Sequence, residues 1–353
     1  NAASTIKLSG IMSQLSSNAT FTNCHNYGNL SIYQGAKGQI FIAGGVCHIV
    51  NGLSGNPVIN INDCSNEGKL YVSDKISHSG TPYYGGFTSY VDNAVKCNYN
   101  KVYNNGELTF KSVATGNNMV YTGGVIGYLD AAVLELNMTD CGNTGELKYL
   151  HSLSQDRKNM YMGGIIGHNG AKLNHTLTNI TNTGNITAAG STNRFILAGL
   201  VGSTANDLPL ENCSNSGNIT VESTQSFNGE HAWVAGLTGV ILETSGTKAI
   251  TLTNCNNSGD ISVKNTAFTG QLAVGGISAQ MIYNSSNSYC GKMYITDCTN
   301  TGDITVENVS VAKDFSVGGI LSSISKKGYA EIKAPTQRGN ITVTIPSANT
   351  VVH

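Results

Sequence analysis

The stretch Asn23-Cys24-His25-Asn26-Tyr27-Gly28-Asn29-Leu30 decides the fold, because variants of it recur along almost the whole chain. The shared pattern is Asn/Asp-Cys-x-Asn-x-Gly-x-Leu/Ile, and two copies carry Val102 or Ile180 in place of the cysteine. Its glycine, termed the marker glycine, recurs at Gly28, Gly68, Gly106, Gly145, Gly184, Gly217, Gly259 and Gly302, with a degenerate copy at Gly339. The spacings between the first eight are 40, 38, 39, 39, 33, 42 and 43 residues. A period of this size predicts repeats that bury their core by stacking on their neighbours.

Each repeat contains three segments in which apolar and polar residues alternate, as they do in a half-buried strand. Directly after the marker glycine, apolar residues flank a mostly polar one, as in Leu30-Ser31-Ile32. A second segment has apolar residues nine and seven positions before the marker, as at Ile59 and Ile61. The third carries a Gly-Gly or Ala-Gly pair followed by a large apolar residue, as in Gly123-Gly124-Val125. Such a pair predicts a bend or a close approach of two backbones.

Three strands per repeat, with like residues in like places, predict an all-β fold. We expect a right-handed parallel β-helix of about nine coils of roughly 39 residues. A β-propeller is the main alternative, but its blades use four antiparallel strands joined by hairpins. Residues 1–353 are expected to form one β-helix domain. Because Ser9-Gly10-Ile11 resembles the end of a glycine-pair strand, the chain is expected to begin within a coil, with further domains removed.

An asparagine stands two residues before the marker glycine in every full repeat. We predict a ladder in which each amide bonds to the next coil, the asparagine tolerates a left-handed backbone, and the marker glycine supplies a positive φ. The predicted ladder residues are Asn26, Asn66, Asn104, Asn143, Asn182, Asn215, Asn257 and Asn300.

The recurring cysteines are predicted to be buried and reduced. Val and Ile replace them in two repeats, so the position requires a small apolar group, which a free cysteine resembles. Parallel neighbours hold their Cβ atoms about 4.8 Å apart, which is too far for an ordinary disulfide. The chain has no Cys-x-x-Cys pair to suggest zinc, and no metal or cofactor is predicted.

The composition restricts the classes of partner that this chain is expected to bind. Only 12% of the residues are charged and the formal net charge is −1, which argues against nucleic-acid binding. No run of about 18 apolar residues occurs, so no membrane-spanning segment is predicted.

The glycine-rich strands resemble a known repeat family. Gly123-Gly124-Val125-Ile126-Gly127 and Gly163-Gly164-Ile165-Ile166-Gly167, each with the marker phrase, are similar to the GLUG-type repeats of bacterial surface proteins. The resemblance covers residues 5–345 and specifies architecture better than activity. It implies an exported protein, displayed on a bacterial surface or secreted, of the kind found among adhesins and secreted proteins of gut Bacteroidetes.

One variable column is the candidate binding site. The position three residues before the second glycine of each pair reads Ile42, Tyr83, Tyr121, Tyr161, Ile196, Trp233, Ala273 and Ser316. The neighbouring position is apolar, so we expect this column to point outward. Tyr83, Tyr121, Tyr161 and Trp233 would then form an exposed stripe that binds a glycan or a partner protein. A column that faces inward, or lies under a loop, is the alternative.

Two other functions stay open. A polysaccharide lyase or hydrolase needs clustered acid–base residues, and the nearest group is Asp156, Arg157, Lys158 and His168. A structural stalk would bind no ligand. No catalytic residue is assigned. Acids that stack on adjacent coils (Glu107 and Glu146; Asp260 and Asp303) favour a solvated turn over a weak Ca²⁺ site.

Overall fold

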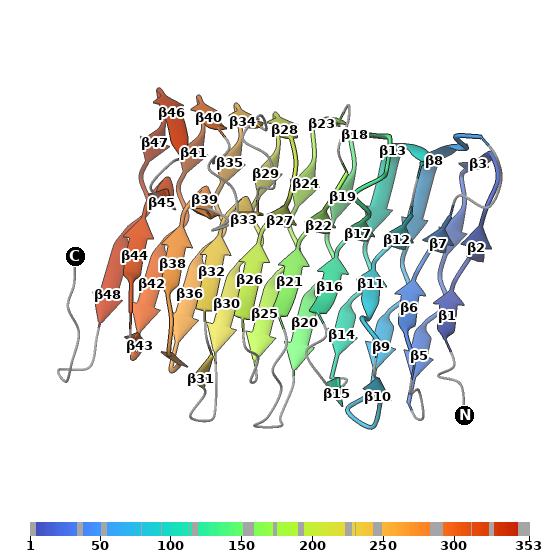
Figure 1. The fold of residues 1–353 in the computed structure, drawn as a ribbon, viewed down its shortest axis with the longest axis horizontal. Helices are drawn as coiled ribbons and strands as arrows, with labels where there is room; N and C mark the ends of the chain where they lie inside the picture. Colours follow the sequence, from blue (N-terminus) through green and yellow to red (C-terminus); the bar gives the residue numbers. More distant parts are fainter. Residues whose placement is uncertain are drawn as a thin grey trace.

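Parallel strands stacked along one long axis make up the described part of the chain, and its first and last strands, β1 (Ile6–Ser9) and β48 (Ile341–Thr344), lie at opposite ends of the stack (Figure 1). The computed structural model describes residues 5–33, 38–50, 55–78, 80–92, 94–111, 113–114, 119–150, 159–171, 175–189, 194–222, 228–229, 231–242, 249–282, 292–311, 313–324 and 328–344. These residues contain strands and turns but no helix. The predicted all-β parallel solenoid is therefore confirmed.

Sheets A and B carry the two halves of the glycine-pair segment. Each has nine strands, and the pair lies between them, as Gly44 does between β6 and β7. Sheet A contains β1 (Ile6–Ser9), β6 (Ile40–Ala43), β11 (Tyr83–Gly85), β16 (Met119–Gly123), β21 (Asn159–Gly163), β26 (Arg194–Ala198), β32 (His231–Ala235), β38 (Leu272–Gly275) and β44 (Phe315–Gly318). Sheet B contains β2 (Met12–Leu15), β7 (Val46–Ile49), β12 (Thr88–Val91), β17 (Ile126–Leu129), β22 (Ile166–Asn169), β27 (Val201–Thr204), β33 (Thr238–Leu242), β39 (Ser278–Ile282) and β45 (Leu321–Ile324).

Sheets C and D carry the segments before and after the marker glycine. Sheet C contains β3 (Ala19–Thr22), β4 (His25–Asn26), β8 (Val58–Asn66), β13 (Lys96–Asn104), β18 (Glu135–Thr139), β19 (Gly142–Asn143), β23 (His175–Thr178), β24 (Thr181–Asn182), β28 (Leu208–Glu211), β29 (Ser214–Asn215), β34 (Ala249–Thr253), β35 (Asn256–Asn257), β40 (Lys292–Thr296), β41 (Thr299–Asn300), β46 (Tyr329–Lys333) and β47 (Thr336–Gln337). Sheet D contains β5 (Leu30–Ile32), β9 (Leu70–Val72), β14 (Leu108–Phe110), β20 (Leu147–Leu150), β25 (Ile186–Ala189), β30 (Ile219–Glu222), β36 (Ile261–Lys264), β42 (Ile304–Glu307) and β48 (Ile341–Thr344). Two small sheets pair β10 (Ser77–His78) with β15 (Val113–Ala114), and β31 (Asn228–Gly229) with β37 (Ala267–Phe268) and β43 (Ser310–Val311).

Two apolar cores run the length of the stack. One is built from residues of sheets B and C, such as Val91 and Ile61, and the other from sheets A and D, such as Tyr84 and Phe110. The recurring cysteines belong to the first core, and the eight cysteines in the described part of the chain are free thiols. Cys290 lies outside the described residues.

The asparagine ladder stands between the two cores and is confirmed. Asn104 donates one amide hydrogen to the carbonyl oxygen of Gly106, at 2.9 Å, and another to Oδ1 of Asn143, at 2.7 Å. The same pair of bonds recurs from Asn26 to Asn300, whose amide donates to Gln337. The asparagine packs on the glycine pair, because a Cβ added to Gly86 would lie 2.4 Å from Cγ of Asn104.

The predicted backbone roles at this turn are wrong. The left-handed residue stands five positions before the marker glycine, as at Asp63 (φ 51°) and Asp140 (φ 53°), and not at the ladder asparagine. Gly55 is the one described glycine with a positive φ. The marker glycine is needed instead for close stacking, since a Cβ on Gly106 would lie 2.0 Å from the carbonyl oxygen of Gly68.

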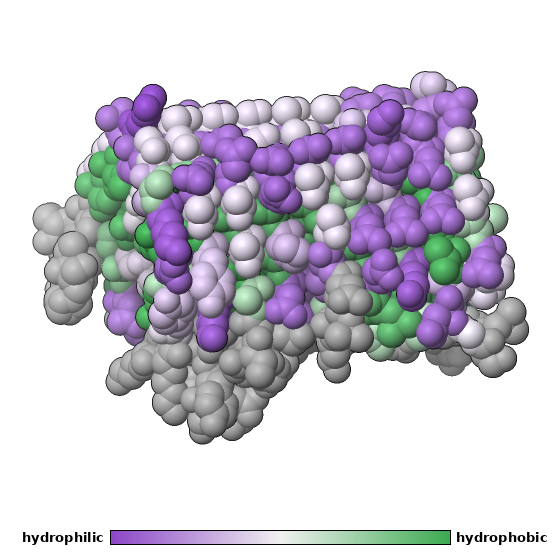
Figure 2. Space-filling view, turned by 90° about the horizontal axis from the view of Figure 1, so that it is seen from above, coloured by the Kyte–Doolittle hydropathy of each residue, from purple (hydrophilic) through white to green (hydrophobic). Residues whose placement is uncertain are grey.

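Rows of polar side chains mark one face of the solenoid (Figure 2). Seen from above, hydrophilic side chains form rows parallel to the long axis, and apolar side chains show at the C-terminal end (Figure 2). Ile332 and Ile341 belong to this end and are 42% and 45% exposed. Among the described residues no helix could cross a membrane.

Candidate functional site

The four predicted binding residues lie in one column of sheet A. Tyr83 pairs with Tyr121, which pairs with Tyr161, and Ile196 separates this run from Trp233. The next residue on each strand, such as Tyr84, belongs to the core between sheets A and D. The column therefore points to the opposite face of sheet A, as expected.

This column is far less exposed than predicted. Tyr83 is half-buried, but Tyr121, Tyr161 and Trp233 are only 7%, 5% and 3% exposed. These three form a separate apolar cluster outside the two main cores, and Tyr83 packs against it. The expectation of an open stripe is wrong for these three rings, because side chains of sheet B pack against the column.

The rings of the column stack on one another along the axis. The centroids of Phe41 and Tyr83 are 5.2 Å apart, those of Tyr83 and Tyr121 are 5.7 Å apart, and those of Tyr121 and Tyr161 are 4.9 Å apart. Phe41, rather than the predicted Ile42, is the first member, because Tyr83 pairs with Phe41 in the register. Each inner ring therefore has both faces covered, and its edge is what remains for a ligand.

A second aromatic column, on sheet B, faces the first. It contains His48, Tyr90, Tyr128 and His168, four residues after the glycine that ends each pair in the structural register. The centroid of Tyr83 lies 4.6 Å from that of Tyr90. We term the two columns together the aromatic seam: Phe41, His48, Tyr83, Tyr90, Tyr121, Tyr128, Tyr161 and His168. Sequence reasoning missed the second column, although the recurrence of Tyr or His four residues after the pair was visible.

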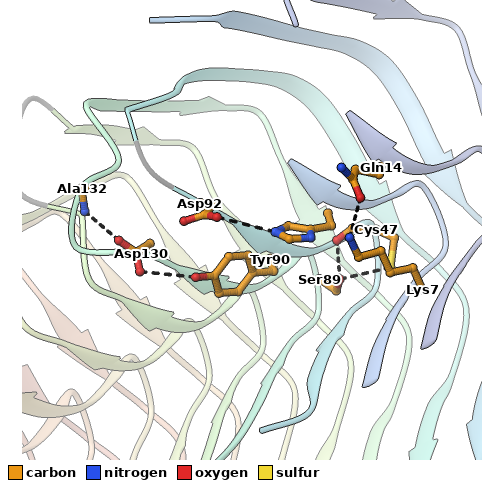
Figure 3. A network of polar contacts seen from close by, with 9 residues as sticks. Lys7, Gln14, Cys47, Ser89, Tyr90, Asp92, Asp130 and Ala132 are labelled. Atoms are coloured by element: carbon orange, nitrogen blue, oxygen red, sulfur yellow. Dashed lines mark hydrogen bonds and ion pairs between the residues drawn. The ribbon is translucent and has the colours of Figure 1, made fainter. Parts of the chain in front are cut away.

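Two carboxylates border the seam where β12 and β17 end. The hydroxyl of Tyr90 donates to Oδ2 of Asp130 at 3.3 Å, and the backbone N–H of Ala132 donates to Oδ1 at 3.0 Å (Figure 3). Oδ2 of Asp92 lies 3.9 Å from Nε2 of His48. Tyr83, Tyr90, Tyr128 and both aspartates are half-buried, so solvent reaches this part of the seam.

Burial keeps the titratable groups of the seam uncharged. It raises the pKa of Tyr83 and Tyr90, and raises that of Tyr128 to about 12; nearby charges add to each effect. Burial also lowers the pKa of His48 and of His168 to about 4. At neutral pH the seam therefore presents neutral rings and hydroxyl groups beside carboxylates.

Beyond Tyr161 and His168 the same two columns hold mostly smaller side chains. Ser203 hydrogen-bonds Nδ1 of His168 at 2.7 Å, and Ala273 follows Trp233. The Trp233 ring stacks on His231 with centroids 5.0 Å apart. The aromatic character thus concentrates in the N-terminal half, and Ile196 separates the Trp233 ring from the stacked tyrosines within the same cluster.

Of the predicted acid–base group, the structure describes only His168. Asp156, Arg157 and Lys158 lie outside the described residues. Lys148 forms ion pairs with both Glu107 and Glu146, so its ammonium group bridges the acids of adjacent coils. Oδ1 of Asp260 accepts a hydrogen bond from the backbone N–H of Asp303 at 2.9 Å. Among the described residues, no group of three or more metal-binding side chains occurs.

Comparison with known proteins returned no match to a family profile, a curated protein or a solved structure.

Proposed function

We propose that this chain is a non-catalytic, adhesin-like binding protein, exported to a bacterial surface or secreted, that binds a glycan through the aromatic seam. One observation carries the proposal: a cluster of aromatic rings, bordered by carboxylates, lies outside both structural cores. A solenoid needs no such cluster to close its core, because each core is already filled by other columns.

The chemistry of the open part of the seam suits a sugar. Half-buried Tyr83, Tyr90 and Tyr128 offer apolar ring edges and hydroxyl groups. Sugars present apolar C–H patches to aromatic surfaces and hydroxyl groups to polar ones. Asp92 and Asp130 supply acceptors for sugar hydroxyls at the border.

Glycan-array screening followed by calorimetry tests the proposal. We expect Tyr83→Ala combined with Tyr90→Ala to weaken binding at least tenfold. Tyr27→Ala combined with Tyr33→Ala is the matched control, because these tyrosines are 75% and 64% exposed and lie outside the seam. Equal affinity for the wild type and the seam variant would reject the seam as the binding site.

The non-catalytic part has its own test. Incubation with a panel of uronic-acid and neutral polysaccharides should release neither unsaturated products nor new reducing ends. Any turnover that tracks with the folded protein would favour the lyase or hydrolase instead.

The finer architecture is also part of the proposal. We infer a right-handed helix of about nine coils, each with three strands, one of them bent at the glycine pair. The nine-stranded sheets A, B and D support this count. A crystal structure that shows left-handed coils or a different number would overturn it.

A further inference from the structure

The recurring cysteines form a column in the core between sheets B and C, and three of them occupy consecutive coils. The backbone N–H of Asn256 donates to the Cys213 carbonyl at 2.9 Å, and that of Thr299 donates to the Cys255 carbonyl at 3.0 Å. These bonds place Cys213, Cys255 and Cys298 one above another, and all three side chains are 0% exposed. We term these three residues the thiol row.

The rest of the column provides a contrast within the same chain. Cys24 and Cys64 are a neighbouring pair, in which the backbone N–H of Cys24 lies 3.4 Å from Sγ of Cys64. Cys141 is isolated, because Val102 and Ile180 fill its place on the coils before and after it. Cys141 is as deeply buried as the thiol row, so the difference between them is the presence of neighbouring thiols.

Neighbouring thiols of the row contact each other directly. A hydrogen bond with Cys255 lowers the pKa of Cys213, and the same contact contributes most to raising the pKa of Cys255 to about 12. Cys298 hydrogen-bonds Cys255 in turn, and this contact, with burial, raises the pKa of Cys298. The three sulfur atoms therefore follow one another without interruption along the solenoid axis.

The spacing of such a row suits a two-coordinate metal ion. Neighbouring parallel strands lie about 4.8 Å apart, and Cβ atoms at that spacing are too far apart for an ordinary disulfide. Two metal–sulfur bonds of about 2.3 Å each span about 4.6 Å. An ion between neighbouring sulfur atoms is then within bonding distance of both.

The surroundings of the row favour Cu(I) over other metals. Thiolates select soft ions such as Cu(I), which prefers them to oxygen ligands. The oxygen atoms that contact the thiols are backbone carbonyls; Cys255 donates to those of Leu210 and Thr253, at 3.4 and 3.2 Å. Zinc requires four ligands, and within the described ranges no three metal-binding side chains converge on one point.

We propose that the thiol row binds two Cu(I) ions, one between Cys213 and Cys255 and one between Cys255 and Cys298. The three thiols release three protons and form four Cu–S bonds, with the Cys255 thiolate bridging both ions. The loaded row carries one net negative charge, which is also the charge of two thiolates that hold a single ion. The row therefore buries two ions at the electrostatic cost of one.

The same rule assigns the other thiols of the column. The pair formed by Cys24 and Cys64 binds one ion, and the isolated Cys141 binds none. The chain therefore holds three Cu(I) ions in this column. This proposal goes beyond the proposed glycan binding and does not depend on it.

Copper stoichiometry tests the rule. The full chain is refolded without oxygen in the presence of Cu(I), because the thiol row has no contact with solvent once folded. It carries Cys290→Ser, since Cys290 lies outside the described residues. A bathocuproine chelator then removes loosely held copper. We expect three ions per chain, each with two sulfur neighbours by X-ray absorption.

Valine replacements are matched variants, because Val102 already fills the same place in the column. Cys255→Val should leave one ion per chain and Cys298→Val should leave two, although each change removes a single thiol. Cys141→Val should leave three. Val102→Cys joins the N-terminal pair to Cys141 in a run of four thiols, so the stoichiometry should rise to five.

Circular dichroism establishes that each variant is folded, and Val102→Cys tests the rule without removing any thiol. Equal losses of copper from Cys255→Val, Cys298→Val and Cys141→Val would show that copper follows the number of thiols and not their adjacency, which would overturn the proposal. Chains that retain no copper, or copper with three sulfur ligands, would also overturn it. None of these outcomes affects the aromatic seam, whose test uses glycans.

Discussion

At the scale of single residues, asparagines that make the same hydrogen bond between coils differ in burial. Asn104 and Asn98 both lie on β13 and both bond to asparagines on neighbouring coils. Asn104 is fully buried, whereas Asn98 is half-buried. The same ladder bond therefore has a different energetic role at the two sites.

Asn104→Ala should lower the free energy of unfolding by about 3 kcal/mol or more, because it leaves Nδ2 of Asn66, Oδ1 of Asn143 and the Gly106 carbonyl short of a buried partner. Asn98→Ala should cost less than about 1 kcal/mol, since water can replace its bonds. Urea unfolding of both variants measures the difference. Similar losses would show that burial does not set the strength of the ladder.

His168 should make stability depend on pH. Its pKa is about 4 in the folded state because the ring is buried, against about 6.5 in an unfolded chain. The unfolded chain therefore takes up a proton first as pH falls, and stability present above about pH 6.5 is lost toward pH 4. A shift of this size corresponds to a loss on the order of 3 kcal/mol.

His168→Gln should reduce this dependence by the share due to His168 while keeping a hydrogen-bonding partner for Ser203. The share due to His48, whose pKa is also about 4, should remain. His25→Gln, at an exposed histidine, is the control. Urea midpoints measured at pH 7 and pH 4.5 report the effect. A wild-type slope in the His168 variant would place the titrating group elsewhere.

At the scale of the strand and turn, stacking distance decides which glycines are irreplaceable. A Cβ on Gly106 would meet the Gly68 carbonyl oxygen at 2.0 Å, whereas the nearest atom to one on Gly28 is Oδ1 of Asn26, at 3.5 Å. The two glycines share one place in the repeat, but no described coil precedes Gly28.

Gly106→Ala should therefore cost about 3 kcal/mol through overpacking, and Gly28→Ala should change stability by less than about 1 kcal/mol. Thermal and urea unfolding of the two variants provide the comparison. A tolerated Gly106→Ala would mean that adjacent coils can separate at this turn without loss.

At the scale of the whole molecule, each coil contacts only its neighbours, so a complete repeat should be removable. Deleting residues 106–144, one spacing of 39 residues, joins Asn105 to Gly145 and keeps every column in register. We expect a folded protein shortened by about 4.8 Å along its axis. Circular dichroism and small-angle scattering check this.

Deleting residues 106–124 instead removes the sheet D and sheet A strands of one coil but keeps its sheet B strand. This variant should not fold, because the columns no longer align. A folded half-repeat deletion would contradict the columnar account of the core.

The fold could be predicted from sequence because its signals are local and repeated. The segments around Leu30 and Ile61 alternate with period two, and the solenoid follows from stacking them.

The second aromatic column could not be found from such alternation. In sheet B, Ile126 and Leu129 both enter a core although they are three residues apart, so alternation fails and Tyr128 points outward. The register error at Phe41 has a similar origin, since Ala43-Gly44-Gly45 offers two equally good pairs.

The side-chain amide dipoles of the asparagine ladder all point the same way along the solenoid axis. From Asn26 to Asn300, every amide donates toward its C-terminal neighbour, and from Asn66 onward each also accepts from its N-terminal one. Dipoles aligned in a chain of hydrogen bonds polarise one another. The carbonyl ends all point toward one end of the solenoid and the amino ends toward the other. The ladder therefore places partial charges of opposite sign at the two ends of the solenoid, although it contains no charged residue.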